Sequence, residues 1–321
     1  MRRLYDEVTH RLTTLDFGRI YPGFHPFRFA LYNDETIWLA GEEIPQQGFY
    51  GNTTVVFEGD RIAIWKVDQD PASYDIDVLT AGIVHEMFHA FQMESDMKNE
   101  APSDLMLLQY PEDENNFLVK QAENELLASS VNATVPRKAV IYHMIRASRN
   151  LRRLNIGDFV RQEELIEKWE GQAECAGTLA LKQLAYRKYE KRLADYAATL
   201  TNGDHLFDIR RNAYFSGTLM CILESEIPKE ACETARRLAE NKKVRKKRFD
   251  DFFANNTVRI PAEGFICGYD PMNQIRMGDR LLADGFVMID VAGEQIHIPG
   301  PVVVDLQTDT PNLVTAYYIR K

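Results

Sequence analysis

The sequence predicts an α+β protein that is mainly helical and consists of a large domain and a small one. Residues 115–240 follow a helical pattern almost throughout. A pair of strand-like runs precedes them at residues 53–67, and further short strands separated by turn residues follow Pro261. The chain has 321 residues, 45% of them hydrophobic and 27% charged, which is enough to bury an ample core.

The first strand pair is expected to form a hairpin. Residues 53–57 and 61–67 are rich in β-branched and aromatic side chains, and Glu58-Gly59-Asp60 forms the turn between them. A short linker leads from this hairpin to the next helix. A strand beside that helix can bind an extended peptide by edge pairing, or it can be ordinary core sheet, and the sequence favours neither.

The middle of the chain is expected to fold into several helices, with prolines at their breaks. The expected helical ranges are 117–132, 137–153, 160–200, 208–226 and 228–246. Beyond Pro261 the expected strands are 286–290, 295–298, 302–306 and 313–319. We therefore expect a boundary near residue 260, with a large domain at 1–260 and a small β-rich module at 261–321.

Composition excludes several classes of function. The chain turns acidic at Asp6 and Glu7 before any apolar run forms, so we expect no secretory signal, and no apolar stretch approaches membrane-spanning length. The net charge of −10 argues against nucleic acid as the main partner, and we interpret the basic block 242–248 as a solvated helix end. The four cysteines form no C-x-x-C pair and are expected to be reduced thiols. These features indicate a cytoplasmic protein that binds neither membrane nor nucleic acid.

Residues 85–89, His-Glu-Met-Phe-His, are the most informative segment of the chain. Residues four apart on a helix share one face, so His85 and His89 can bind a single metal ion. Glu86 can then act as a general base toward water that the metal activates. Asp75 and Asp77 suit the first turn of this helix, and an apolar repeat follows them. A cation would satisfy two imidazoles that are otherwise costly to bury in so apolar a helix, and the motif predicts Zn²⁺.

Catalytic zinc usually has three protein ligands and one open position, so a third ligand must lie elsewhere. The best candidate is Glu170, in the segment 169–174, Trp-Glu-Gly-Gln-Ala-Glu. Here the sequence resembles the gluzincin metallopeptidases, the thermolysin and aminopeptidase group, whose second helix carries a Glu-(Gly/Ala)-x-Ala-like segment with the third ligand. It also resembles bacterial peptidase-MA-type proteins, in which E-G-x-A-E-Y follows H-E-x-x-H, except that Cys175 replaces the tyrosine. Gly171, which has no Cβ, would let the zinc helix approach closely.

Two other acids compete with Glu170 as the third ligand. Glu123 and Glu125 lie 34 and 36 residues after His89 and also fall on an expected helix. For Glu125, a structural role such as bracing the wall of the site or pairing with an arginine is an alternative.

The resemblance implies a zincin-like catalytic domain at 1–260, with a small sheet and active-site helices. Because Glu170 lies 81 residues after His89, it also implies a helical insertion at about 98–160. Glu174 lies one turn after Glu170, where the thermolysin-like pattern has an acid that orients the first histidine, here His85. Tyr214, in a Tyr-x-x-Gly-x-Leu segment, resembles the aminopeptidase tyrosine that donates to the oxyanion, and His205 is the alternative donor.

These residues lead to two hypotheses of different kinds. The first is a zinc-dependent hydrolase of gluzincin type, most simply a peptidase, that cleaves an amide bond of a peptide or protein substrate with Glu86 as general base. A non-peptide amide or an epoxide is also chemically possible as its substrate. The second is a non-catalytic or regulatory zinc-binding protein on a zincin scaffold. The presence of Glu86 favours catalysis, because a structural zinc site has no use for that carboxylate.

Overall fold

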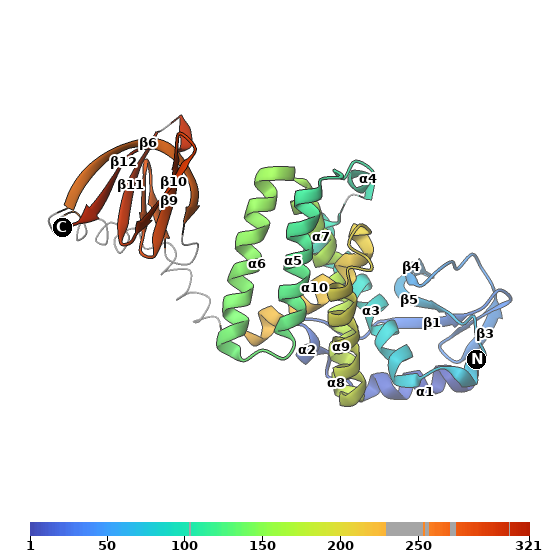
Figure 1. Ribbon diagram of the computed structural model, residues 1–321. Helices are drawn as coiled ribbons and strands as arrows, with labels where there is room; N and C mark the ends of the chain where they lie inside the picture. The colour runs from blue at the N-terminus through green and yellow to red at the C-terminus, as the bar shows by residue number, and fades with distance from the viewer. Residues whose placement is uncertain (103, 229–252, 254–256, 270–273, 308) are drawn as a thin grey trace. The chain divides into compact units, whose positions relative to one another are not determined.

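The computed structural model describes residues 1–321 except 103, 229–252, 254–256, 270–273 and 308 (Figure 1). The chain forms two compact units, Met1–Cys232 and Glu233–Lys321. The first combines helices with a sheet and the second contains a larger sheet, so the expected α+β class is confirmed. The expected helix 228–246 and the basic block 242–248 lie outside the described residues. Within the described part of the chain, no helix is both long and apolar enough to cross a membrane.

The first unit contains a five-stranded sheet in the order β3-β2-β1-β5-β4. Strands β1 and β5 are parallel, and the other neighbours are antiparallel. The expected hairpin is present as β4 and β5, with Glu58 and Gly59 at positive φ in the turn, and β4 lies at an edge of the sheet. The strands are β1 Arg28–Tyr32, β2 Thr36–Leu39, β3 Glu42–Pro45, β4 Thr53–Phe57 and β5 Asp60–Lys66.

Helix α3, Ile76–Glu94, carries the motif and packs against this sheet (Figure 1). Its first turn is fixed by Asp75, whose carboxylate accepts from the amides of Asp77 and Val78. Gly82 permits the close packing, because a Cβ there would lie 2.6 Å from the indole of Trp65 on β5. The motif is therefore placed on a helix that is buried against both strands and helices.

The first unit contains further helices besides α3, among them α8, which carries Glu174. They are α1 Arg2–Thr13, α2 Phe17–Ile20, α4 Asp104–Leu107, α5 Glu114–Ser130, α6 Val135–Ile156, α7 Phe159–Ile166, α8 Gln172–Leu184, α9 Tyr186–Asn202 and α10 Ile209–Glu226. Short turns occur at η1 Pro71–Ser73 and η2 Asp96–Glu100, and a π-helix, η3, spans Glu167–Gly171.

The expectation of one helix over 160–200 is wrong. The π-helix η3 interrupts it, and Ala185, with φ −152 and ψ 85, separates α8 from α9. The break lets α9 turn back along α8 and α5, where Tyr189, Leu193 and Leu200 are buried. No proline or glycine marks this point in the sequence. We therefore attribute the break to packing between the helices rather than to local preference.

Helices α5, α6 and α7 are joined by buried ion pairs as well as by apolar contacts. Lys120 Nζ lies 2.6 Å from Glu163, which also accepts from Arg152. Arg152 lies 3.1 Å from Glu123, and Arg149 holds another carboxylate in the same layer. All the pairs are almost fully buried, so each charge depends on its partner for stability.

The second unit contains an antiparallel seven-stranded sheet in the order β10-β9-β6-β12-β11-β8-β7. The four expected strands are present as β9–β12, whereas β6, β7 and β8 were not expected. Strand β6 begins before residue 260 and contains Pro261, Gly264 and Gly268, which normally discourage strands. Gly264 fits because a Cβ there would lie 2.3 Å from a backbone oxygen of β9. The strands are β6 Thr257–Tyr269, β7 Gln274–Met277, β8 Arg280–Ala283, β9 Phe286–Val291, β10 Glu294–Pro299, β11 Val302–Gln307 and β12 Thr310–Arg320.

We predict that Glu163→Gln destabilises the protein by about 3 kcal/mol, because Lys120 and Arg152 would remain buried without their shared carboxylate. Urea unfolding measures the change. As a control, Glu7→Gln, which removes an exposed pair with Arg3, should leave the free energy of unfolding unchanged within error. A loss below 1 kcal/mol for Glu163→Gln would contradict the importance of the buried pairs.

The same carboxylate gives a pH dependence of stability. Burial by itself raises the pKa of Glu163, but Lys120 and Arg152 outweigh it and lower the pKa from 4.5 to about 2. A depressed pKa stabilises the folded state fully above the unfolded pKa, and this contribution is lost as pH falls from about 4.5 toward 2. Between pH 6 and pH 3, the wild type should therefore lose more stability than Glu163→Gln.

Candidate metal centre

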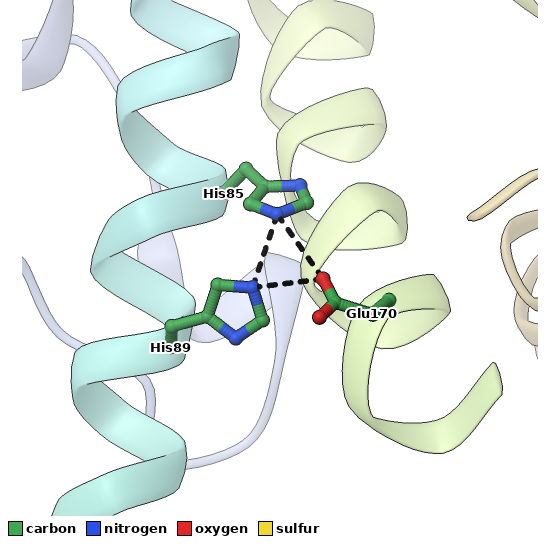
Figure 2. A group of neighbouring side chains, drawn as sticks. All are labelled: His85, His89 and Glu170. Atoms are coloured by element: carbon green, nitrogen blue, oxygen red, sulfur yellow. Dashed lines mark hydrogen bonds and ion pairs between the residues drawn. The ribbon is translucent and has the colours of Figure 1, made fainter. Parts of the chain in front are cut away.

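His85 and His89 project from the same face of α3, one turn apart (Figure 2). Their ring centroids are 4.8 Å apart, and their Nε2 atoms are separated by 3.1 Å. Both side chains are nearly buried, with exposed fractions of 9% and 12%. Two nitrogen atoms with lone pairs are thus directed at the same small volume.

Glu170 reaches this volume from η3, on a different helix (Figure 2). Its Oε2 lies 3.3 Å from His89 Nε2 and 4.0 Å from His85 Nε2. Tetrahedral bonds of about 2.0–2.2 Å place neighbouring ligand atoms roughly 3.4 Å apart. The three atoms, which all lie within 4.8 Å of one another, are therefore spaced as one metal ion requires.

The two rival acids are not in this cluster. Glu123 is instead bound to Arg152 at 3.1 Å and to Ser148 at 2.9 Å. Glu125 is exposed and accepts from Gln121 on the same helix. Within the described part of the chain, Glu170 is the carboxylate that joins the two histidines.

The hydrogen bonding of Glu170 leaves one of its oxygens for a cation. Arg210 donates to Oε1, whereas the buried Oε2 has no neighbouring donor except the ring nitrogen Nε2 of His89, 3.3 Å away. Burial by itself raises the pKa of Glu170, but His89, Tyr214 and Arg210 lower it to about 2. When Nε2 of His89 carries no proton, this charged and buried oxygen has no hydrogen bond, which is costly, and a metal ion beside it would remove that cost.

Outer partners orient both imidazole rings. His85 Nδ1 lies 2.8 Å from Glu174 Oε2, and His89 Nδ1 lies 2.7 Å from Gln92 Oε1. The amide nitrogen of Gln92 donates to the backbone oxygen of Trp169 at 2.9 Å, so its oxygen must accept from the ring. Each Nδ1 therefore donates a proton, which leaves each Nε2 free to bind a metal.

Gln92 was not expected from the sequence. It is completely buried on α3, three residues after His89, and a polar residue on that apolar face was the available signal. Glu174 occupies the position expected for it, and its second oxygen accepts from Tyr196 and Arg192.

Close contact between two glycines fixes the position of η3 against α10. A Cβ on Gly171 would lie 2.5 Å from Gly217 Cα on α10, and a Cβ on Gly217 would lie 2.7 Å from the Glu167 backbone oxygen. The carboxylate of Glu167 is itself held by Arg149 at 2.8 Å and Ser216 at 2.7 Å. The π-helix, with its extra residue per turn, directs Glu170 toward α3.

The expectation that Gly171 lets the zinc-binding helix approach closely is therefore wrong. Gly171 contacts α10, and it is Gly177 that allows α8 to approach the motif helix, because a Cβ there would lie 2.5 Å from the Ala81 backbone oxygen. The sequence signalled a close approach but could not show which helix would make it.

Glu86 and Tyr214 lie beside the cluster. Glu86 is 7% exposed, and burial raises its pKa although His85 and His89 oppose the change. The Tyr214 ring lies parallel to that of His85 at 5.9 Å, and burial, followed by the charge of Glu170, raises the pKa of its hydroxyl. His205 is not part of the cluster and stacks on Phe215.

Comparison with protein-family models, with curated proteins and with solved structures finds no match to this chain. What the site can do therefore follows from its own residues. It offers three inward-facing ligand atoms, outer partners that fix two of them, and an adjacent buried carboxylate.

We predict that Glu174→Ala weakens zinc binding by about 10- to 100-fold, because His85 would lose the partner that orients its ring. Competition with a chromophoric chelator measures the affinity. Glu125→Ala is the matched control and should leave the affinity unchanged. An equal loss in both variants would contradict the assigned role of Glu174.

We also predict that Gly217→Ala weakens zinc binding by at least about tenfold and lowers stability by about 1–3 kcal/mol, since the new methyl group displaces η3. The same chelator competition and urea unfolding measure both effects. Gly18→Ala, where the nearest atom to the new Cβ would be 3.5 Å away, should leave metal affinity unchanged. Normal zinc affinity in Gly217→Ala would show that the glycine contact does not position Glu170.

Proposed function

We propose that this protein is a zinc-dependent hydrolase of gluzincin type, most simply a peptidase with a zincin-like core. The observation that carries the proposal is the meeting of His85, His89 and Glu170 across two helices, with Glu86 beside the first ligand. Two histidines and a glutamate are the ligand set of thermolysin-like catalytic zinc, which leaves one position for substrate or water.

The donor atoms support zinc as the resident metal. Two neutral imidazole nitrogens and one carboxylate oxygen suit Zn²⁺, and the orphaned Oε2 of Glu170 provides the negative charge. When bound at His85, His89 and Glu170, zinc would polarise the substrate carbonyl and lower the pKa of water to about 7.

The chain's own residues would then handle the protons. Glu86, which is buried beside the first ligand, takes a proton from the attacking water and delivers it to the leaving amine. Tyr214, whose ring stacks beside that of His85, donates a hydrogen bond from its hydroxyl to the developing oxyanion. Glu174 and Gln92 hold the Nδ1 protons in place throughout.

The edge of the first sheet is suited to pairing with an extended peptide. Strand β4 lies at the edge of the first sheet and contacts α3, so its backbone can pair with an extended chain. This edge favours a peptide over a compact small molecule as the substrate.

We predict that Glu86→Gln retains stoichiometric zinc but lowers kcat by at least about 100-fold, because the metal ligands remain while the general base is lost. Cleavage of a quenched fluorescent peptide library measures the activity, and a chelator should abolish it in the wild type. Glu94→Gln, an exposed change on the same helix, serves as the control and should keep full activity. Metal-dependent cleavage that persists in Glu86→Gln would refute the chemistry, and zinc binding without any cleavage would favour the non-catalytic alternative.

A further inference from the structure

A large apolar groove lies on the first unit beside α5 and the start of α10. Its volume is about 920 Å³, within the range of ligand-binding pockets. The helical segment expected as an insertion provides one wall, and the residues that lead into α10 provide the other. Its apolar lining includes Leu108, Phe117, Leu118, Leu206, Phe207 and Ile209.

Several of these side chains are unusually exposed. Leu108, Leu118 and Phe207 have exposed fractions of 84%, 63% and 74%. The Phe207 ring meets the edge of Phe117 at 4.7 Å, so the aromatic part of the lining is already organised. A contiguous exposed apolar surface of this kind is typical of a binding site.

The groove shares residues with a smaller pocket that is lined by supporting residues of the metal centre. Asp208 and Arg210 line the groove and also line a smaller pocket of about 360 Å³, whose walls include Tyr214 and Glu174. Arg210 also donates to the metal-facing carboxylate of Glu170. An occupant of the groove that contacts Arg210 would therefore be separated from the ligand Glu170 by one side chain.

We propose that this groove binds a bulky apolar side chain, such as phenylalanine or leucine, of an extended peptide substrate close to the bond that is cleaved. The proposal rests on the proposed hydrolase function and names its substrate preference. It also gives the helical insertion a purpose, since α5 supplies Phe117 and Leu118.

The charge of the rim favours a peptide over an anionic lipid. Glu112, Glu114 and Asp208 lie on the lining, while the positive charge of Arg210 is already engaged by Glu170. Carboxylates at the mouth repel phosphate headgroups but accept a neutral or basic peptide backbone and its flanking residues.

The test uses zinc-loaded full-length protein and quenched heptapeptides that differ at a single position, with phenylalanine, leucine, alanine or aspartate there. At the position whose side chain enters the groove, phenylalanine or leucine should raise kcat/KM at least about tenfold over alanine. The double variant Leu118→Arg with Phe207→Ala should reduce this ratio to below about threefold with zinc content unchanged. Leu154→Arg, an equally exposed change on α6 outside the groove, should keep the preference.

A binding measurement separates failure of the groove from failure of the hydrolase. Fluorescence anisotropy follows labelled phenylalanine and alanine heptapeptides binding to zinc-loaded Glu86→Gln, with and without the groove substitutions. A binding preference for phenylalanine that the groove substitutions remove supports the proposed groove, whether or not any peptide is cleaved. If no peptide is cleaved, that result counts against the hydrolase function alone. The proposal is overturned if neither assay shows an apolar preference, or if the preference survives in the double variant. It is equally overturned if that variant changes only stability or self-association, since the groove would then be covered by this protein itself.

Discussion

A buried, charged carboxylate oxygen that faces two imidazole nitrogens is the interaction on which the rest of the site depends. Glu170 Oε2 has no neighbouring donor except His89 Nε2 at 3.3 Å, whereas the other oxygen of the same carboxylate is bound by Arg210. A protein interior rarely leaves such an atom without a partner, because its desolvation is not repaid. A cation bound between Glu170, His85 and His89 resolves this cost, and the spacing of the three ligand atoms fits it.

The surrounding structure holds this arrangement from two directions. Glu174 and Gln92 fix the rings from behind, so the nitrogens that face the centre are those without protons. The glycine contact between η3 and α10 and the ion pair between Arg149 and Glu167 fix the backbone that carries Glu170. Buried ion pairs contribute little net stability but are costly to break singly, so they favour one arrangement of the helices.

The parts of the site that the sequence predicted are those set by local geometry or by a motif. His85 and His89 follow from helical spacing, while Glu170 and Glu174 came from resemblance to a motif, and all four lie together in the structure. No rule of sequence spacing identifies Gln92, and its role depends on the backbone of Trp169, 77 residues away. Partners that come from distant helices are fixed by packing, which a single sequence does not display.

The same distinction explains the fold. Strands β9–β12 are short apolar runs bounded by turn residues and were predicted, whereas β6 contains proline and glycines and was missed. The break at Ala185 has no local signal, because it is set by how α9 packs on α8 and α5. The apolar groove was also invisible in the sequence, since its walls come from segments about 90 residues apart.

X-ray absorption at the zinc edge of the purified, zinc-loaded protein tests the central claim most directly. We predict one zinc per chain bound only by nitrogen and oxygen at about 2.0–2.1 Å, with scattering from two imidazoles that falls to one in His89→Ala. A sulfur ligand at about 2.3 Å, or zinc that does not remain bound at one per chain, would contradict it.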